Sequence, residues 1–225
     1  MNNKKFELVN YVFFSLVILA TLVLTIVLHL NWLAFISCAA SILYIVFLSE
    51  RNILNFLIGF VSSATYIIIA QQSRLFGEVL FYLLFDIPMI LVSFLMWRKH
   101  METKYKVETK KLTIKNIIYI FILSAVMVVS YGFLLKMIGG QNTFLDALST
   151  VVTLIATLLM AFRYREQWFM WIIVYIVSII LWVTTFNLLM IIMSSSCLLS
   201  SIIGYINWSF SSKKDKKDVN KTWHI

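Results

Sequence analysis

Charged residues and helix-breaking residues are both scarce in this chain. Asp, Glu, Lys and Arg make up 13% of the 225 residues, and the sequence contains one proline and six glycines. Hydrophobic residues make up 61%, whereas an average soluble domain has about 45 to 50%. This composition excludes a soluble globular protein. It predicts an all-α integral membrane protein, because helices satisfy their own backbone hydrogen bonds in lipid.

Histidine and cysteine are also rare, which limits the chemistry available within the membrane. The three histidines lie at the ends of apolar runs or near the C-terminus, and Cys38 and Cys197 lie in separate runs. This distribution supports neither a disulfide framework nor a set of metal ligands. A GxxxxGK(S/T) phosphate loop is absent as well, which excludes ATP hydrolysis through that motif. We therefore expect no enzyme activity and no cofactor.

Eight apolar runs are long enough, or nearly so, to cross the roughly 30 Å hydrocarbon core of a bilayer as helices. They cover residues 7–30, 32–48, 53–71, 76–97, 116–137, 144–162, 167–185 and 187–208. Eight spans place both termini on one side, and the positive-inside rule assigns that side to the cytoplasm. With this topology, 17 of the 19 lysines and arginines lie inside. The basic residues therefore indicate orientation in the cell membrane, not binding of nucleic acid.

The later spans repeat the earlier ones. A shift of 111 residues superposes three spans on three others, so that Asn31 meets Asn142 and Trp97 meets Trp208. One further helix separates the two sets, so both enter the membrane in the same direction. This is a parallel repeat of the SWEET type, with the substrate path between the units. The predicted parts are an N-terminal helix (1–31), a first three-helix repeat (32–97), a basic cytoplasmic loop and linker helix (98–142), a second three-helix repeat (143–208) and a basic cytoplasmic tail (209–225).

One face of the span 167–185 carries aromatic and polar side chains. At helical spacing this face contains Trp168, Trp171, Tyr175, Ser178 and Trp182. Tryptophan often marks the membrane interface, so anchoring is an alternative for Trp168. Tyr175 lies too deep for that role. We therefore predict that the deeper part of this stripe binds an aromatic ligand by stacking.

Asp86 is the one acidic residue that we expect deep inside a span, about 15 Å from its start at roughly 1.5 Å per residue. A carboxylate at this depth would suit a cationic or hydroxyl-rich substrate. The alternative is a structural Asp that bonds backbone groups freed by Pro88. Phe60, the repeat counterpart of Trp171, and Asn187, near the outer end of a span, complete the candidate binding residues.

The segments 98–115 and 213–225 are strongly basic, and we expect both to be solvated. A membrane receptor or assembly subunit would use such segments to engage a partner. This receptor or assembly role is our alternative to the transporter hypothesis, and it belongs to a different functional class.

Four short motifs in the second half of the chain resemble the signature of the Pnu-type vitamin transporters, the family of the nicotinamide riboside transporters. They are LDA at 145–147, LMAxR at 159–163, EQWxxW at 166–171 and GYxxW at 204–208. The resemblance implies a SWEET-like fold, often as a homotrimer, and facilitated diffusion of nicotinamide riboside that phosphorylation in the cell then traps. Similar carriers take thiamine, riboflavin or deoxynucleosides, so these substrates remain alternatives.

Overall fold

The structure, a computed structural model, describes residues 3–101, 107–140 and 142–222, and it describes side chains for 10–101, 107–140 and 142–209 of these. Apart from two isolated β-bridges, every regular element in these ranges is a helix. The elements are α1 (Asn3–Val27), α2 (Trp32–Ser49), α3 (Asn55–Gln72), α4 (Phe76–Phe81), η1 (Tyr82–Asp86), α5 (Ile87–Arg98), α6 (Ile114–Met137), α7 (Thr143–Ala161), α8 (Gln167–Thr184) and α9 (Leu188–Thr222).

These helices correspond to the eight predicted spans, because α4, η1 and α5 follow one another without a loop. Within the described ranges, seven spans are long and apolar enough to cross a membrane; α3, with 18 residues, has the length but is not among these seven. The all-α membrane fold is thus confirmed. The clearest difference is at the end, where α9 continues to Thr222 through the segment predicted as a tail. Lysine is a good helix former in water, so the helix does not end where the apolar run ends.

A π-helical turn interrupts the fourth span. The turn η1 lies just before Pro88. Proline lacks a backbone N–H, and in a regular α-helix its ring would clash with the carbonyl of Leu84. The wider π-turn relieves this clash, and such turns often occur at functional sites. Here the turn ends at Asp86, whose side chain is buried in the bundle.

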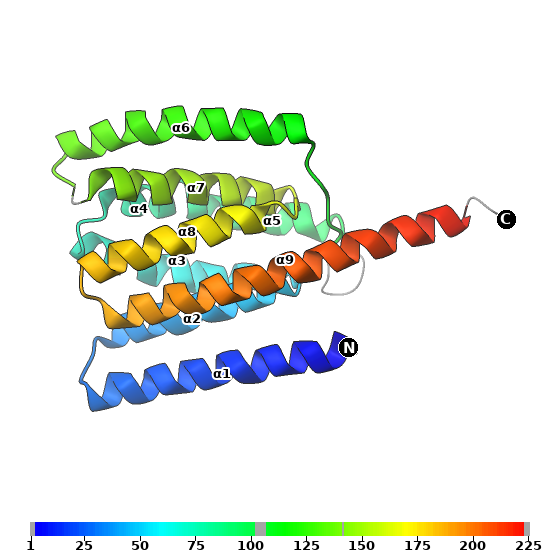
Figure 1. Cartoon of the computed structure of the whole chain (residues 1–225). Coiled ribbons are helices and arrows are strands. Elements are labelled where there is room, and N and C mark those ends of the chain that lie inside the picture. Colours follow the sequence, from blue (N-terminus) through cyan, green and yellow to red (C-terminus); the bar gives the residue numbers. More distant parts are fainter. Residues whose placement is uncertain (1–2, 102–106, 141, 223–225) are drawn as a thin grey trace.

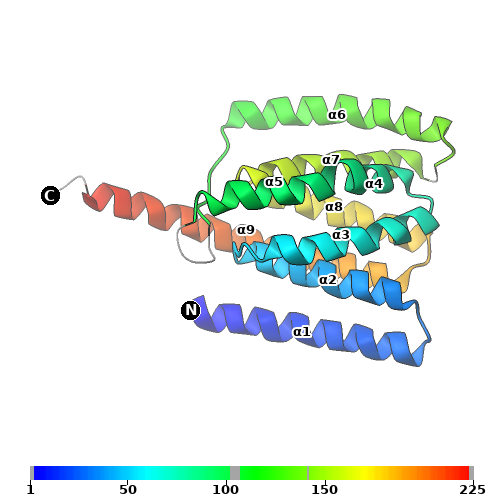
Figure 2. The ribbon, with the colours of Figure 1, turned by 180° about the vertical axis from the view of Figure 1, so that it is seen from behind.

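Six of the spans form a closed ring. Within the first repeat, α2 packs on α3 and α3 packs on α5; within the second, α7 packs on α8 and α8 packs on α9. The repeats meet twice, where α4 and α5 pack on α7 and where α9 packs on α2. Figures 1 and 2 show this arrangement from opposite sides. Both chain ends lie at the same end of the bundle in Figure 1, together with the elbows that follow α2 and α7, and we call this the basic end.

The helices α1 and α6 flank the ring in equivalent positions. α1 packs on α2 and α6 packs on α7, the first helices of the two repeats, at opposite edges of Figure 1. The connections repeat as well, since left-handed residues occur at matching places. These pairs are His29 and Gly139, Arg51 and Arg163, and Arg74 and Phe186. The parallel repeat is therefore present in the backbone, and it includes the helix before each three-helix unit.

The described part of the basic loop is tied to both repeats, contrary to the expectation of a solvated segment. Val107 is fully buried, and its N–H donates to the Arg51 carbonyl at 3.3 Å while Arg51 Nη1 donates to the Val107 carbonyl at 2.9 Å. The Lys110 N–H donates to the Arg163 carbonyl at 2.8 Å. The loop thus joins the elbows that end α2 and α7. Its residues 102–106 lie outside the described ranges.

Arg163 is a buried cation at the second of these elbows. Its guanidinium Nη1 lies 3.7 Å from Glu108 Oε2, a carboxylate supplied by the same loop. Burial lowers the pKa of Arg163, and the Glu108 charge opposes that shift. The ion pair adds a side-chain contact to the backbone bonds that hold the loop in place.

Asp146 joins the two repeats at the end opposite the basic end. Its carboxylate accepts hydrogen bonds from the backbone N–H groups of Gly77, at 2.8 Å, and Glu78, at 3.1 Å. These N–H groups belong to the first turn of α4 and have no acceptor within their own helix. The contact is close, because a Cβ on Gly77 would lie 2.6 Å from Asp146 Oδ1. The position of α4 against α7 therefore depends on this carboxylate.

We predict that Asp146→Ala lowers the free energy of unfolding by more than about 2 kcal/mol, since each buried N–H left without an acceptor costs about 1 to 3 kcal/mol. Equilibrium unfolding in detergent measures this change. Asp146→Asn is the matched control, because its amide oxygen still accepts one hydrogen bond. The free energy of unfolding of this variant should fall by about half as much. An alanine variant as stable as the wild type would contradict the role given to Asp146.

Candidate functional site

A small polar cavity lies inside the six-helix ring, between the two repeats. The first repeat supplies one side from α2, α3 and the broken span α4–η1–α5, and α8 and α9 supply the other. Its volume is about 40 Å³, enough for a few water molecules at roughly 10 to 15 Å³ each. The lining residues are Ser41, Tyr44, Gly59, Ser62, Ser63, Tyr66, Glu78, Tyr82, Asp86, Ile90, Trp171, Val174, Tyr175, Ser178 and Met193.

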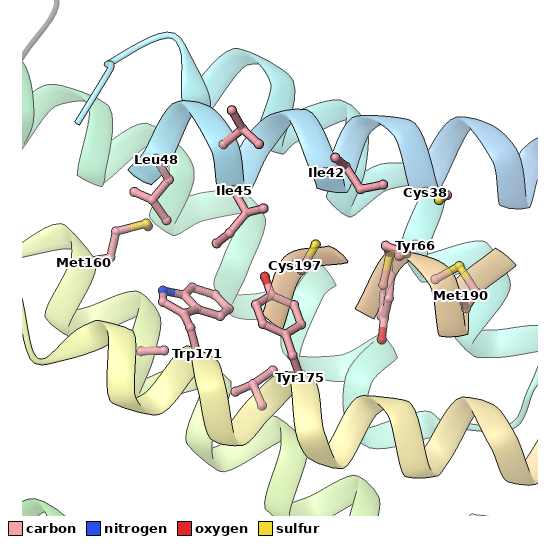
Figure 3. Close-up of a cluster of buried hydrophobic side chains, with 14 of the residues drawn as sticks. Cys38, Ile42, Ile45, Leu48, Tyr66, Met160, Trp171, Tyr175, Met190 and Cys197 are labelled. Carbon is pink, nitrogen blue, oxygen red and sulfur yellow. The ribbon is translucent and has the colours of Figure 1, made fainter. Parts of the chain in front are cut away.

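Aromatic rings line the cavity on both sides. The rings of Trp171 and Tyr175 are stacked, with centroids 5.8 Å apart and an interplanar angle of 19°. Figure 3 shows both rings projecting from α8 toward α2, with Cys197 of α9 beside Tyr175. From the first repeat, Tyr66 and Tyr82 contribute a second pair with centroids 4.7 Å apart. A flat ligand would therefore find aromatic faces on two sides of the cavity.

Two buried carboxyl groups, those of Glu78 and Asp86, also line the cavity. Ser63 Oγ donates to Asp86 Oδ2 at 2.6 Å, and Ser149 Oγ donates to Glu78 Oε1. The lining residues, all within the described ranges, include no Lys, Arg or His. Two acidic groups with neutral donors and no cation would favour a positively charged ligand, because an unpaired charge is costly within a membrane.

The sequence analysis missed Glu78, since we expected Asp86 to be the one acidic residue deep in a span. Glu78 lies near the start of its helix and so is not deep in the span, but it is 2% exposed and lines the same cavity. Glu78, Tyr82 and Asp86 are spaced by four residues, so they share one helical face. This spacing was the sequence signal that could have identified Glu78 as a lining residue. The tyrosines Tyr44 and Tyr66 gave no comparable pattern.

Four of the predicted binding residues line the cavity together. They are Trp171, Tyr175, Ser178 and Asp86. The three from α8 follow the helical spacing on which the prediction was based, while Asp86 reaches the cavity from the π-turn of the opposite repeat. The structure thus brings together the deeper part of the stripe and the intramembrane carboxyl group.

Two other members of the stripe are buried elsewhere. Trp168 lies at the basic end, with its ring centroid 5.9 Å from that of Trp208. It also covers Gly204, where a Cβ would lie 2.5 Å from the indole. Trp182 packs edge-on against Tyr66 with centroids 5.7 Å apart. Neither tryptophan lines the cavity, so both support the packing around it.

Phe60 and Asn187 also lie away from the cavity. Phe60 is 51% exposed and lines an apolar groove of about 640 Å³ with Leu57, which is 73% exposed. That groove is on the outer, lipid-facing side of α3 and α5, because helical spacing places Phe60 on the side opposite Ser62. Asn187 Oδ1 accepts the Met190 N–H at 3.3 Å, so this side chain caps the start of α9.

Comparison with known proteins identifies the family. Residues 31–210 match the family model described as nicotinamide mononucleotide transporter. This chain belongs to that family. The matched residues include both repeats and the linker helix, and every residue that lines the cavity is among them.

Relatives within the nicotinamide mononucleotide transporter family carry a more specific name. The chain is 35% identical over 191 residues to the nicotinamide riboside transporter PnuC of Neisseria mucosa, a match that covers 80% of this chain and 72% of the relative. It is also 35% identical over 182 residues to the nicotinamide riboside transporter PnuC of Haemophilus influenzae, covering 80% of each protein. The family resemblance inferred from the four motifs is confirmed.

The fold agrees with a solved structure. The crystal structure of the vitamin B3 transporter PnuC matches this chain with a TM-score of 0.83 and 31% sequence identity, covering 91% of this chain and 92% of that one. The SWEET-like architecture predicted from the internal repeat is therefore shown for this member of the family.

We predict that Trp171→Ala weakens ligand binding at least about fivefold, because stacking on an aromatic side chain contributes about 1 to 3 kcal/mol. Isothermal titration of the purified protein with nicotinamide riboside measures the change. Phe60→Ala removes a comparable ring from the lipid-facing groove and should bind as the wild type does. Equal affinities for the wild type and Trp171→Ala, with the fold intact, would mean that Trp171 contributes to packing and not to ligand binding.

Proposed function

We propose that this protein carries nicotinamide riboside across the cell membrane by facilitated diffusion. The observation that supports this most strongly is the composition of the cavity, which combines aromatic rings from both repeats with the carboxyl groups of Glu78 and Asp86. Nicotinamide riboside consists of a pyridinium ring and a hydroxyl-rich sugar. The rings suit a flat cationic heterocycle through stacking and cation–π attraction.

Within this proposal, Asp86 pairs with the positive charge of the substrate. Ser63 fixes one carboxyl oxygen of Asp86 by donating a hydrogen bond, which leaves the other oxygen for the ligand. Ser41, Ser62 and Ser178 line the same cavity and can bond sugar hydroxyl groups. Trp171 and Tyr175 provide the face on which the pyridinium ring stacks.

The size of the cavity supports a transport cycle with at least two conformations. A cavity of about 40 Å³ is far below the roughly 300 to 1,000 Å³ of ordinary ligand pockets. The structure is therefore a contracted state, and a nucleoside enters only when the two repeats separate. Such movement of one repeat against the other is how alternating access works in carriers with parallel repeats.

The proposal includes the orientation and assembly of the protein. Most of the basic residues lie at the end of the bundle that contains both termini, which supports a cytoplasmic location for that end. The family resemblance further implies a homotrimer in the membrane. Native mass measurement in detergent tests the trimer directly, and a monomer under conditions that preserve transport would overturn it.

We predict that Asp86→Asn reduces the affinity for nicotinamide riboside at least about tenfold, because hydrogen bonds to charged groups contribute about 1.5 to 3 kcal/mol. The uncharged, reduced dihydro form of the same nucleoside should bind the wild type and the variant equally. Asparagine still accepts the Ser63 hydrogen bond, so folding is preserved. If Asp86→Asn lost the same affinity for the charged and the uncharged ligand, recognition of the ligand charge by Asp86 would be contradicted.

Substrate choice is tested by a thermal-shift panel with nicotinamide riboside, thiamine, riboflavin and deoxynucleosides. Nicotinamide riboside should stabilise the protein most, since a ligand raises stability in proportion to the logarithm of its concentration over its dissociation constant. Stabilisation by another compound alone would transfer the assignment to that compound. A response to none of them would leave the receptor or assembly function as the better account.

A further inference from the structure

Two tryptophans at the basic end form reciprocal hydrogen bonds between the repeats. Trp97, the next-to-last residue of α5, donates its Nε1–H to the carbonyl of Met160 in α7 at 3.0 Å. Trp208 of α9 donates its Nε1–H to the carbonyl of Leu48 in α2 at 3.3 Å. Each bond therefore runs from the last helix of one repeat to the first helix of the other.

The two acceptors are equivalent positions of the internal repeat. The Leu48 carbonyl also accepts the N–H of the left-handed residue Arg51, and the Met160 carbonyl accepts that of Arg163, each at 2.9 Å. Each acceptor thus lies in the last turn of the first helix of its repeat, at the elbow. Because the donors and acceptors both correspond, the pair of bonds follows the pseudo-symmetry of the molecule.

The rings of these tryptophans close the interior of the helix ring. Trp97 and Trp208 lie with centroids 5.9 Å apart, and both are fully buried. Phe56 packs edge-on against Trp97 at 5.0 Å, and Trp168 packs in the same way against Trp208 at 5.9 Å. We call these four residues the aromatic plug. A substrate that leaves the cavity toward the basic end has to pass through it.

One contact connects the aromatic plug to the cavity. Tyr44 lines the cavity, and its hydroxyl donates to Met160 Sδ at 3.1 Å. The backbone carbonyl of the same Met160 accepts the Trp97 bond. A ligand that displaces Tyr44 therefore acts on the residue that holds Trp97. Figure 3 shows Met160 near Trp171, which also lines the cavity.

We infer that Trp97 and Trp208 are the gate residues at the basic end, and that their two indole–carbonyl hydrogen bonds hold the gate closed. The inference rests on the proposed transport function but not on the identity of the substrate. Opening requires α5 to leave α7 and α9 to leave α2, which are the two contacts between the repeats. Breaking these bonds separates the repeats where the cavity has to widen.

The test measures access to the cavity from each side of the membrane. The reporter thiol is introduced at a lining position by Ser62→Cys, in a protein that also carries Cys38→Ala and Cys197→Ala. A membrane-impermeant thiol reagent is added to either side of oriented proteoliposomes without substrate. Trp97→Phe and Trp208→Phe each keep a ring in the plug but remove one hydrogen bond. Trp168→Phe is the matched control, because its indole nitrogen has no hydrogen-bond partner among the described residues.

Trp97→Phe and Trp208→Phe should each accelerate labelling from the basic end about fivefold, the shift expected when one hydrogen bond of ordinary net strength is lost. Labelling from the opposite side should slow, because the inward-open population grows at the expense of the outward-open one. Trp168→Phe should change the labelling rate from either side by less than Trp97→Phe and Trp208→Phe do. Unchanged labelling in both gate variants, or equal acceleration from both sides, would overturn the inference. Neither result depends on which compound binds, so the substrate assignment is tested separately.

Discussion

The contacts of α5 with α7 and of α9 with α2 close the six-helix ring, and the remaining features of the molecule depend on that closure. Polar side chains in a bilayer require partners within the protein or in a water-filled cavity. Closing the ring provides such an interior for Glu78, Asp86 and the surrounding hydroxyl groups. The tryptophan bonds at the basic end belong to these two contacts, and the Asp146 contact at the other end joins α4 to α7. Under the proposed function, these contacts have to open before a substrate can move.

The electrostatic character of the cavity follows from what its walls contain. Both carboxyl groups receive hydrogen bonds from serine side chains, and the lining residues include no basic residue. A cation stabilises a carboxylate more strongly than neutral hydrogen-bond donors do. A positively charged ligand is therefore expected to bind favourably in this site. The aromatic rings add attraction for the flat face of such a ligand. Shape, charge and ring chemistry therefore favour the same class of compound, which is the class named for the relatives.

Much of the fold could be predicted because apolar run length and the distribution of lysine and arginine are direct consequences of the bilayer. The repeat was visible in the spacing of the spans, and Trp171, Tyr175 and Ser178 followed from helical periodicity. Phe60 could not be placed, because periodicity identifies a face but not which face meets lipid in a helix that is apolar nearly all round. Glu78 was missed because it is buried where α4 packs on α7, a contact between residues far apart in sequence. The basic loop is held at both elbows largely through backbone groups, which the sequence does not reveal.

The measurement that tests this account most directly is a structure of the protein determined with nicotinamide riboside bound. The account predicts ligand density between the two repeats, with the pyridinium ring against Trp171 and Tyr175 and its charge facing Asp86. It also predicts that the cavity is several times larger than the 40 Å³ seen here. Density in a lipid-facing groove such as the one lined by Phe60, or an unchanged cavity at saturating ligand, would contradict it.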